Sequence, residues 1–349
     1  MENDDRCTRE PNMEHSIQKH FHNHPILEHA ITRFGIDKTD LAYVGGFQNF
    51  IYEYRQNGKP YILRFTPSSH RTVDLVEAEL EWILYLADNG MSVSKPVYSR
   101  NSAMTEVIDS TGLYFTAVSF EKASGRKIGY PECLQDETLY EKLGQMTGKL
   151  HALSKLYRPK DESMRRHDWN RNYYLQNIDF LPPSQTLVRE SYNKLLDKIW
   201  ALPKTAASYG LIHGDINVGN FLVDDEGTIT LFDFDEAQYS WFVEDIAIQL
   251  YYLVYVYGGE DGAEKREEQA YRFMKFFMKG YRKEKSLDDF WLKQIPLFLQ
   301  LRELIVYIGA YRNFDGDETF SGKNQWFRDW IAESKARLEN GRPIVNIWD

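Results

Sequence analysis

The chain has 349 residues, of which 42% are hydrophobic, enough to build two packed subdomains. With 42 Lys and Arg against 52 Asp and Glu, its formal net charge is −10, which argues against nucleic acid as a partner, because neutralising phosphates requires a basic face. The two cysteines, Cys7 and Cys133, lie far apart in the sequence and suggest neither a disulfide framework nor a thiolate metal cluster, so we expect a cytoplasmic protein.

Residues 1–24 are predicted to form a solvated N-terminal arm. They carry acids and histidines where a secretion signal would have a basic start and an apolar core. His20, His22 and His24 alternate along the chain and could bind a metal ion, but a solvated arm is the simpler interpretation.

Residues 25–120 are predicted to form a β-rich lobe with one helix. Two strands are expected over residues 50–55 and 61–65, joined by an Asn-Gly turn. Apolar residues then recur with helical spacing from 72 to 89, and a glycine follows as a stop signal. The stretches "SKPVYS" and "LYFTAVSF" suggest further strands of the same sheet.

Residues 121–349 are predicted to form a larger, mainly helical lobe, which makes the fold class α+β. The stretch "IAIQLYYLVYVY" over residues 246–257 contains a Gln and falls short of the ~20 residues that cross a bilayer, so it predicts a buried helix and no membrane span. Apart from one hairpin, the rest of this half is expected to be helical. Its amphipathic helices are predicted over residues 137–153, around 189–200 and over 264–282.

That hairpin lies between "HGDINVGN" and "LFDFDE", and it carries the candidate chemistry. Its strands are predicted over residues 221–223 and 229–232, so Asn220 before the first strand should lie beside Asp233 after the second. A carboxylate and an amide oxygen make a partial Mg²⁺ site, of the kind that waters and substrate phosphates complete. Asp215 is not needed for the metal and would be free to accept a proton from a hydroxyl. Apolar strands flank both acids, and an unpaired charge is costly there, which favours a functional role over a surface turn.

The pair His-Gly-Asp-x-x-x-x-Asn and Asp-Phe-Asp resembles the catalytic core of the aminoglycoside phosphotransferase and choline kinase superfamily, relatives of the protein kinases. "GGFQN" with "IYEY" resembles the nucleotide-covering hairpin of that family, and "YILRF" resembles its strand with a basic residue. "LGQMTGKLHAL" and "VEDIAIQL" are similar to the helices before and after its catalytic loop. The resemblance implies a two-lobed protein-kinase-like fold and ATP-dependent transfer of a phosphoryl group to a hydroxyl, with Mg²⁺.

The resemblance also implies roles for single residues. Asp215 would orient or deprotonate the acceptor hydroxyl, and Asn220 and Asp233 would hold Mg²⁺ on the ATP phosphates. Arg64 stands where protein kinases use Lys, and its guanidinium would touch the α- and β-phosphates as a bidentate fork. Nucleotide binding as a whole is assigned to Gly45, Gly46, Asn49, Arg64, Glu79, Phe120 and Lys122.

Two of these nucleotide assignments also predict particular contacts. Glu79 on the predicted helix over 72–89 should pair with Arg64; the register favours it over Glu77 and Glu81, although the choice stays open by one turn. Adenine would hydrogen-bond to the backbone around residues 120–122.

Further polar residues are interpreted as structural. His151 and His213 are expected to support the catalytic loop, and Asp245 is expected to anchor its backbone. The acids of the hairpin turn are expected to be solvated, as turn acids usually are. They are Asp224, Asp225 and Glu226.

Only about ten residues separate Asp233 from Asp245, which leaves no room for the activation segment on which a protein kinase binds a peptide. We therefore expect a small-molecule acceptor, and the surrounding acids favour a cationic one that is aminoglycoside-, choline- or homoserine-like. Acceptor contacts are expected among Asp168, Trp169, Glu260, Asp261, Asp315 and Asp317.

Two other functions stay open at this point. One is a kinase-like protein that binds nucleotides without transferring phosphate, against which the complete set of Asp215, Asn220 and Asp233 argues. The other is a metal-dependent phosphohydrolase, which would have no use for Arg64 or an adenine site. Nothing in the sequence indicates an oligomeric state.

Overall fold

The computed structural model describes residues 15–46 and 48–348, and the chain divides into two compact units. The first unit contains the described residues up to Ala87 together with Ser94–Ala123 and Pro159–Arg165. The second contains Asp88–Val93, Ser124–Arg158 and the described residues from Arg166 onward. The break between Ala123 and Ser124 lies close to the lobe boundary predicted at residues 120–121. The predicted α+β class is confirmed, because the first unit is built on an antiparallel sheet and the second on helices.

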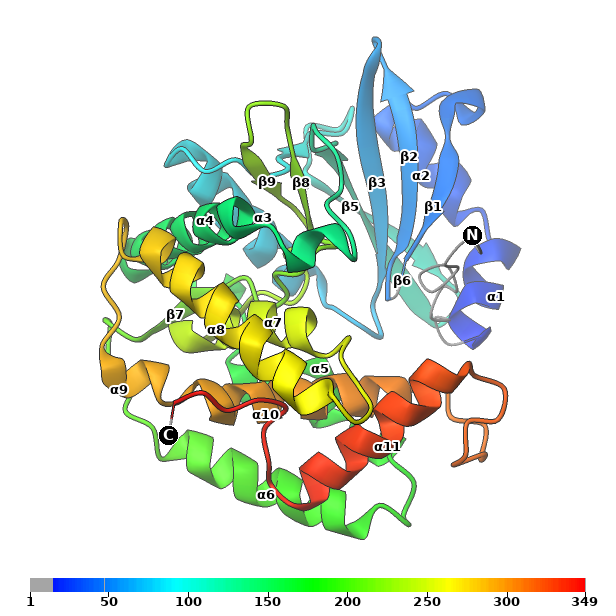
Figure 1. Cartoon of the computed structure of the whole chain (residues 1–349). Helices are drawn as coiled ribbons and strands as arrows, with labels where there is room; N and C mark the ends of the chain where they lie inside the picture. Colours follow the sequence, from blue (N-terminus) through cyan, green and yellow to red (C-terminus); the bar gives the residue numbers. More distant parts are fainter. Residues whose placement is uncertain (1–14, 47, 349) are drawn as a thin grey trace, which may run out of the picture. The chain divides into compact units, whose positions relative to one another are not determined.

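The first unit is a six-stranded antiparallel sheet with three helices (Figure 1). The strands pair in the order β1-β2-β3-β6-β4, and β5 also pairs with β6. The predicted turn is confirmed: Asn57 and Gly58 have φ angles of 53° and 76°, the left-handed backbone that a tight two-residue hairpin turn requires. The elements are α1 (His15–Asn23), α2 (Ile26–Phe34), β1 (Ala42–Gly45), β2 (Phe50–Gln56), β3 (Lys59–Pro67), α3 (Val73–Asp88), β4 (Pro96–Val97), β5 (Thr105–Ser110) and β6 (Leu113–Glu121).

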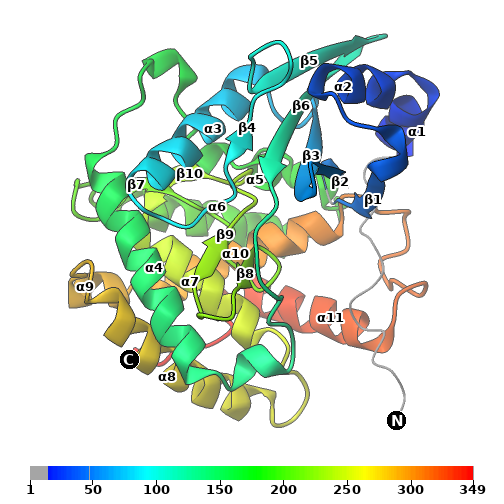
Figure 2. The same cartoon turned by 90° about the horizontal axis from the view of Figure 1, so that it is seen from above.

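The helix α1 corrects the prediction of a solvated arm over residues 1–24, of which residues 1–14 lie outside the described part of the chain. The helix α2 is an addition to the one helix that was predicted over residues 25–120. Ile17 and Phe21 of α1 are buried, and the Phe21 ring stacks on that of Phe50 at a centroid distance of 3.9 Å. The helix α2 packs against β5 and β6 (Figures 1 and 2). The apolar residues of α1 recur four positions apart, so they share one helix face, and the alternating histidines obscured that pattern.

The second unit is mainly helical (Figure 2). Its two small antiparallel sheets pair β7 with β10 and β8 with β9. The hairpin of β8 and β9 confirms the prediction, but β7 and β10 were not expected, because strands of four residues leave little periodicity to detect. The elements are α4 (Glu137–Leu156), α5 (Tyr173–Gln176), α6 (Thr186–Trp200), β7 (Tyr209–Ile212), β8 (Phe221–Val223), β9 (Ile229–Leu231), β10 (Gln238–Trp241), α7 (Phe242–Val254), α8 (Gly262–Tyr281), α9 (Asp289–Leu292), α10 (Ile295–Ala310) and α11 (Gln325–Glu339).

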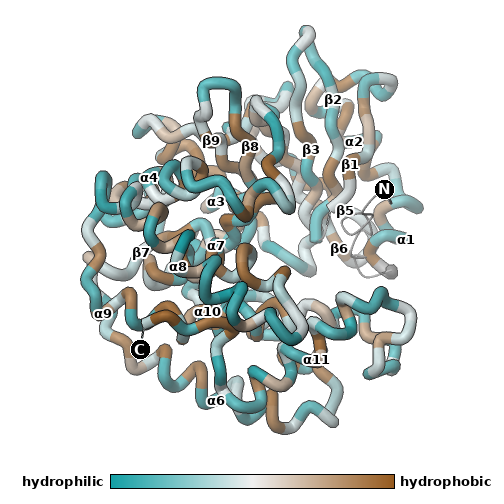
Figure 3. Tube along the Cα trace, viewed as in Figure 1, coloured by the Kyte–Doolittle hydropathy of each residue, from teal (hydrophilic) through white to brown (hydrophobic). Residues whose placement is uncertain are grey.

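The helices α7 and α10 pack on one another in the core of this unit, and Figure 3 shows hydrophobic residues along α10. Every residue of α7 except Tyr252 is buried, which confirms the predicted core helix over residues 246–254. The helix ends at Val254, so the last three residues of the apolar stretch lie outside it. Over the described residues, no helix combines the length and apolar character that a membrane crossing requires.

Helices α4 and α8 lie side by side because glycines bring their backbones together (Figures 1 and 2). A Cβ atom at Gly144 would stand 1.9 Å from the carbonyl oxygen of Phe277, and one at Gly280 would stand 1.8 Å from that of Glu141. Since real Cβ atoms do not approach so closely, larger residues would force the helices apart. The close packing fixes the position of α4, which carries His151. We refer below to the segment between β7 and β8, which contains Asp215, as the predicted catalytic loop.

Candidate active site

The segment that carries Asp215 connects β7 to β8 and turns sharply at Gly214. This glycine has a φ angle of 80°, and a Cβ atom there would lie 2.2 Å from the carbonyl oxygen of Glu236. Both the left-handed backbone and the close approach therefore require glycine. The turn brings the segment after β9, which contains Glu236, against the catalytic loop.

Asp245 at the start of α7 stabilises this turn by accepting hydrogen bonds from its backbone. Its Oδ2 accepts a hydrogen bond from the backbone N–H of His213 (3.0 Å), and its Oδ1 accepts one from that of Gly214 (2.8 Å). His151 Nε2 lies 3.1 Å from Oδ2, and its Nδ1 lies 2.9 Å from the hydroxyl of Tyr281. Burial alone would raise the pKa of the Asp245 carboxyl, but the bonds from His151 and the backbone outweigh it and the pKa is lowered. The supporting roles predicted for Asp245 and His151 are confirmed.

The ring of His213 links the catalytic loop to the segment after β9. Its Nδ1 accepts a hydrogen bond from the backbone N–H of Asp215 (3.2 Å), so the other nitrogen carries the proton. That nitrogen, Nε2, donates to the carbonyl oxygen of Phe232 (3.2 Å). Because Phe232 directly precedes Asp233, the ring fixes the spacing between the two acidic segments, as the structural interpretation of His213 predicted.

Asp215 is half-buried, with 23% of its side chain exposed, so a hydroxyl can still reach it. Its Oδ2 accepts a hydrogen bond from Asn220 Nδ2 (2.9 Å), and its Oδ1 forms an ion pair with Arg302 of α10. Burial raises the pKa of the Asp215 carboxyl, Arg302 lowers it, and Glu236 adds to the rise. A carboxylate in this setting can orient a hydroxyl and accept its proton.

The hairpin places Asn220 and Asp233 at the same end. Phe221 pairs with Leu231, and Phe232 N donates to the Asn220 carbonyl (3.1 Å), so Asp233 is the next residue along from the partner of Asn220. The Asn220 side-chain N–H groups donate to the carbonyl and carboxylate of Asp215 (2.9 Å each), which leaves the amide oxygen as the atom that can face a cation.

Asp233 corrects one expectation. Its flanking apolar residues do not bury it: the side chain is exposed, and the backbone has a φ angle of 62°. The strand β9 ends at Leu231, and a left-handed residue two positions later turns the carboxylate outward; the buried acid of this segment is Asp235. A left-handed aspartate next to a catalytic loop is uncommon, and such residues occur often at functional sites.

In the first unit, Arg64 of β3 and Glu79 of α3 form a buried bidentate ion pair. Arg64 Nη1 donates to Glu79 Oε1 (2.8 Å) and Nη2 donates to Oε2 (2.7 Å). This confirms the predicted partner, while Glu77 instead accepts from Thr105 and Glu81 from the backbone of Lys160. The paired fork fixes the direction of the guanidinium, which also lies over the ring of Phe120 at 5.1 Å.

Gly45, the last residue of β1, and Gly46 after it have backbone angles that favour glycine. Their φ angles are 126° and 147°, and a Cβ atom at Gly46 would lie 1.8 Å from the carbonyl oxygen of Asn49. Asn49 itself is buried. The backbone at Gly46 therefore passes close to that of Asn49, which glycine permits, and nucleotide contact by these three residues stays a prediction.

The predicted adenine contacts at residues 120–122 also stay a prediction, with one restriction. The backbone N–H of Glu121 donates to the carbonyl oxygen of Lys95 (2.8 Å), and that of Lys122 donates to the carbonyl oxygen of Pro60 (3.3 Å). The Lys122 side chain binds Glu53 at 2.7 Å. A base that binds here would therefore use carbonyl groups or residues beyond Lys122.

The acids expected around the acceptor differ in their surroundings. Trp169 is fully buried between Trp200 and Trp241, so its predicted contact with an acceptor is wrong. Burying a large aromatic ring in the core stabilises the fold more than exposing it at a binding site would. Asp168 accepts a hydrogen bond from the hydroxyl of Tyr209 (2.5 Å). Asp317 is satisfied inside its own loop, where hydrogen bonds from the side chains and backbone of Ser321 and Thr319 lower its pKa.

Glu260, Asp261 and Asp315 are exposed, and acceptor contact by any of them stays a prediction. Asp261 lies 3.5 Å from Lys265 one helical turn further on, and Asp315 accepts from the backbone of Asp317 (3.1 Å).

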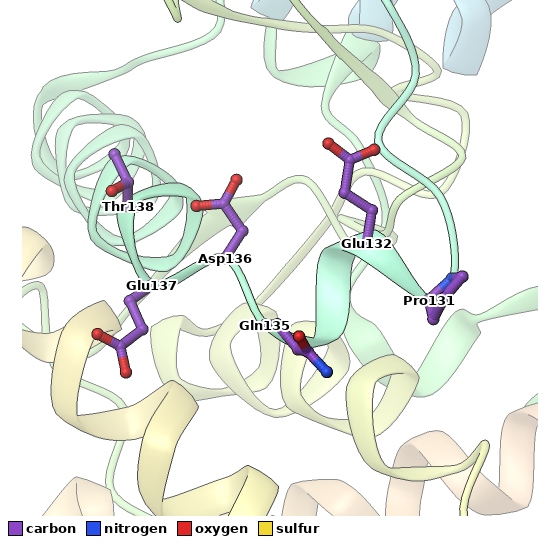
Figure 4. A pocket seen from close by; sticks show the side chains of 6 residues that line it. All are labelled: Pro131, Glu132, Gln135, Asp136, Glu137 and Thr138. Atoms are coloured by element: carbon purple, nitrogen blue, oxygen red, sulfur yellow. The ribbon is translucent and has the colours of Figure 1, made fainter.

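A surface pocket at the start of α4 lies outside this site (Figure 4). Two of its acids have structural partners: Glu132 pairs with Arg126 at 2.6 Å, and Asp136 caps α4 by accepting from the N–H of Leu139 (2.8 Å). Its lining residues are Pro131, Glu132, Gln135, Asp136, Glu137 and Thr138.

Sequence reasoning missed Arg302, Tyr252 and Glu236 at the site. Arg302 stands with Glu303 in the otherwise apolar stretch "LQLRELIVYIG", and an arginine in a core helix needs a buried partner. That pattern could have marked Arg302 but not identified its partner.

Comparisons with known proteins agree with this arrangement. The sequence model of the phosphotransferase enzyme family matches residues 42–282. The amicoumacin kinase of Bacillus subtilis (strain 168) is 36% identical over 332 residues, which cover 94% of this chain and 96% of the relative. The solved structure of amicoumacin kinase hAmiN in complex with AMP-PNP, Ca²⁺ and Ami matches with a TM-score of 0.85 at 32% identity, over 95% of this chain and 98% of that one. The microcompartment-associated aminopropanol kinase, at 20% identity, shares the fold with a TM-score of 0.72 over 90% and 96% of the two chains.

Proposed function

The chain belongs to the phosphotransferase enzyme family and is an ATP-dependent kinase of a small molecule, and we propose that its acceptor carries an amino group near the hydroxyl. The charges around Asp215 carry this proposal. Asp215 and Glu236 are two acids beside one arginine, Arg302, and Glu236 raises the pKa of both partners. With all three groups charged, the set has a formal charge of −1, which an ammonium would neutralise.

Asp215 would act on the acceptor hydroxyl in this scheme. The loop after β9 supports a small acceptor, because β9 ends at Leu231 and α7 begins at Phe242 with only β10 and short turns between them. A peptide platform of the kind that protein kinases build from their activation segment has no place there. Most of the rate would come from positioning the hydroxyl and from stabilising charge on the transferred group.

The enzyme uses ATP with a divalent metal ion, as kinases of this family do. Asn220 and Asp233 fit a cation that prefers oxygen ligands. The N–H groups of the Asn220 side chain donate to Asp215, so its amide oxygen can face a cation, and Asp233 presents an exposed carboxylate. We assign these two residues to Mg²⁺, which would neutralise charge on the ATP phosphates. In the first unit, we assign Arg64 to the ATP phosphates, which it would bind through its guanidinium.

The acceptor is tested by measuring ADP release with a panel of compounds. Amicoumacin, from which the kinase of Bacillus subtilis takes its name, is the first compound, followed by aminoglycosides, choline, homoserine and other amino alcohols. Their matched controls are sugars and alcohols of similar size without an amino group. We expect amine-bearing acceptors to have the higher kcat/KM, because a charge pair removed from water discriminates strongly against a neutral analogue.

Glu236→Gln sharpens the same test, because it removes the charge and keeps the shape. Its Michaelis constant for the best acceptor should rise roughly tenfold or more while that for ATP stays unchanged, since charge-assisted hydrogen bonds contribute about 1.5–3 kcal/mol. Glu226→Gln is the matched control at an exposed acid of the hairpin turn. A best acceptor that is a neutral sugar or an anionic metabolite would refute the proposed amino group and leave the kinase activity standing.

Arg64→Lys tests the nucleotide side. The change keeps the positive charge, but an ammonium group cannot form both of the coplanar hydrogen bonds that the guanidinium makes to Glu79. The positive group is therefore no longer held in a fixed orientation. We expect the Michaelis constant for ATP to rise roughly tenfold or more, because one charge-assisted bond contributes about 1.5–3 kcal/mol and 1.4 kcal/mol is a factor of ten. Steady-state kinetics with varied ATP measure the effect. Arg55→Lys, an exposed position on the neighbouring strand β2, should change nothing; an equally silent Arg64→Lys would mean that charge alone matters.

A further inference from the structure

Arg302 connects the helical core to the catalytic carboxylate. It lies in the middle of α10, and 8% of its side chain is exposed. Besides the ion pair with Asp215 Oδ1, its Nη2 donates to the hydroxyl of Tyr252 (2.6 Å), and its Nη1 lies 3.5 Å from the carbonyl oxygen of Gly214. The guanidinium also stacks over the Tyr252 ring at 5.0 Å. One planar group thus holds the side chain of the catalytic aspartate, the backbone before it and the one residue of α7 that is not buried.

These contacts leave one side of the Asp215 carboxylate for an acceptor. Arg302 binds Oδ1, while Oδ2 accepts an N–H from Asn220. An ionised carboxylate oxygen has two lone pairs, so Oδ2 can accept a second hydrogen bond from a substrate hydroxyl. The rigid fork of arginine, held by Tyr252 as well, restricts the rotation of the carboxylate in a way that an ammonium on a flexible chain would not.

We propose that Arg302 is a positioning residue for phosphoryl transfer, which directs Oδ2 of Asp215 toward the acceptor hydroxyl, and that Tyr252 holds Arg302 in place. The inference rests on the proposed role of Asp215 and adds two residues from α7 and α10 to it. It also gives a reason for the arginine in the apolar helix α10, because replacing a buried ion pair by apolar residues is often neutral or even stabilising.

The test compares kcat with the Michaelis constant for ATP in Arg302→Lys, Arg302→Met and Tyr252→Phe. Arg302→Lys should lower kcat roughly tenfold or more, because the charge remains and the orientation of Asp215 is lost. Arg302→Met should lower kcat at least as much, and Tyr252→Phe should lower it in the same direction. The Michaelis constant for ATP should stay unchanged in all three.

Arg266→Met is the matched control, because Arg266 is also a buried arginine and its Nη1 lies 3.3 Å from a carboxylate oxygen of Glu333. It should lower stability without lowering kcat. If Arg302→Met does not fold, Arg302→Lys and Tyr252→Phe decide: unchanged kcat in both overturns the inference. Unchanged kcat in a folded Arg302→Met overturns it too, provided that Asp215→Asn is inactive. Full activity of Asp215→Asn would instead refute the proposed function of Asp215 itself.

Discussion

Asp215→Asn is expected to abolish phosphoryl transfer while leaving the binding of ATP with Mg²⁺ nearly intact. The change replaces one oxygen by an NH₂ group and keeps the shape, but an amide cannot accept the proton of a hydroxyl. General base catalysis contributes about 10²- to 10⁴-fold, and kcat should fall by that factor. ADP release measures the loss, and calorimetric titration with a non-hydrolysable ATP analogue measures binding. Asp225→Asn, an exposed acid in the hairpin turn, should keep full activity.

The same variant should also lose some stability, because Arg302 would lose the carboxylate with which it forms its ion pair. Removing one partner of a fully buried ion pair costs about 3–5 kcal/mol. The loss should be smaller here, since Asp215 is 23% exposed and the Tyr252 hydroxyl still accepts from Arg302. Urea unfolding gives the value. A matching loss of nucleotide affinity in a folded Asp215→Asn would move Asp215 into the metal site and contradict its assignment to the acceptor.

Local patterns in the sequence were sufficient for the elements that carry the site. The Asn-Gly turn between β2 and β3, the helical period of α3 and the short strands around the "DDEG" turn are all local signals, and the structure has each of them. The resemblance implied a helix carboxylate as the partner of Arg64, and the helix register favoured Glu79, which the structure confirms, although the choice had stayed open by one turn. Motifs in a fixed order then implied the roles.

Contacts between distant segments were beyond such reasoning. Arg302 is 87 residues from Asp215 in the sequence, and only the packing of α10 on α7 brings it there. No period within α10 reveals which buried acid an arginine will meet. The burial of Trp169 between two other tryptophans was missed for the same reason, because "HDWNRNYY" reads as a polar loop.

The backbone at Asp233 was also hidden from the sequence, and it decides how this residue should be tested. A φ angle of 62° strains most residues by about 1–2 kcal/mol, but Asn and Gly tolerate it. Asp233→Asn therefore changes the charge without straining the turn, Asp233→Gly removes the side chain at no conformational cost, and Asp233→Ala adds strain. Comparing the three separates a metal ligand from a turn residue.

If Asp233 holds Mg²⁺, Asp233→Asn and Asp233→Gly should both require roughly ten- to hundredfold more Mg²⁺ for half-maximal nucleotide binding, because a charged ligand contributes about 1.5–3 kcal/mol. Their stability should stay close to that of the unchanged protein, whereas Asp233→Ala should combine the metal defect with a loss in unfolding free energy. Mg²⁺ titrations of nucleotide binding, with Asp225→Asn as the control, give the first quantity and urea unfolding gives the second. Unchanged titrations in Asp233→Gly would show that the exposed carboxylate binds no metal. Since Asp215→Asn is expected to spare the same titration, the two aspartates should fail in opposite assays, and that contrast assigns one to the acceptor and the other to the metal.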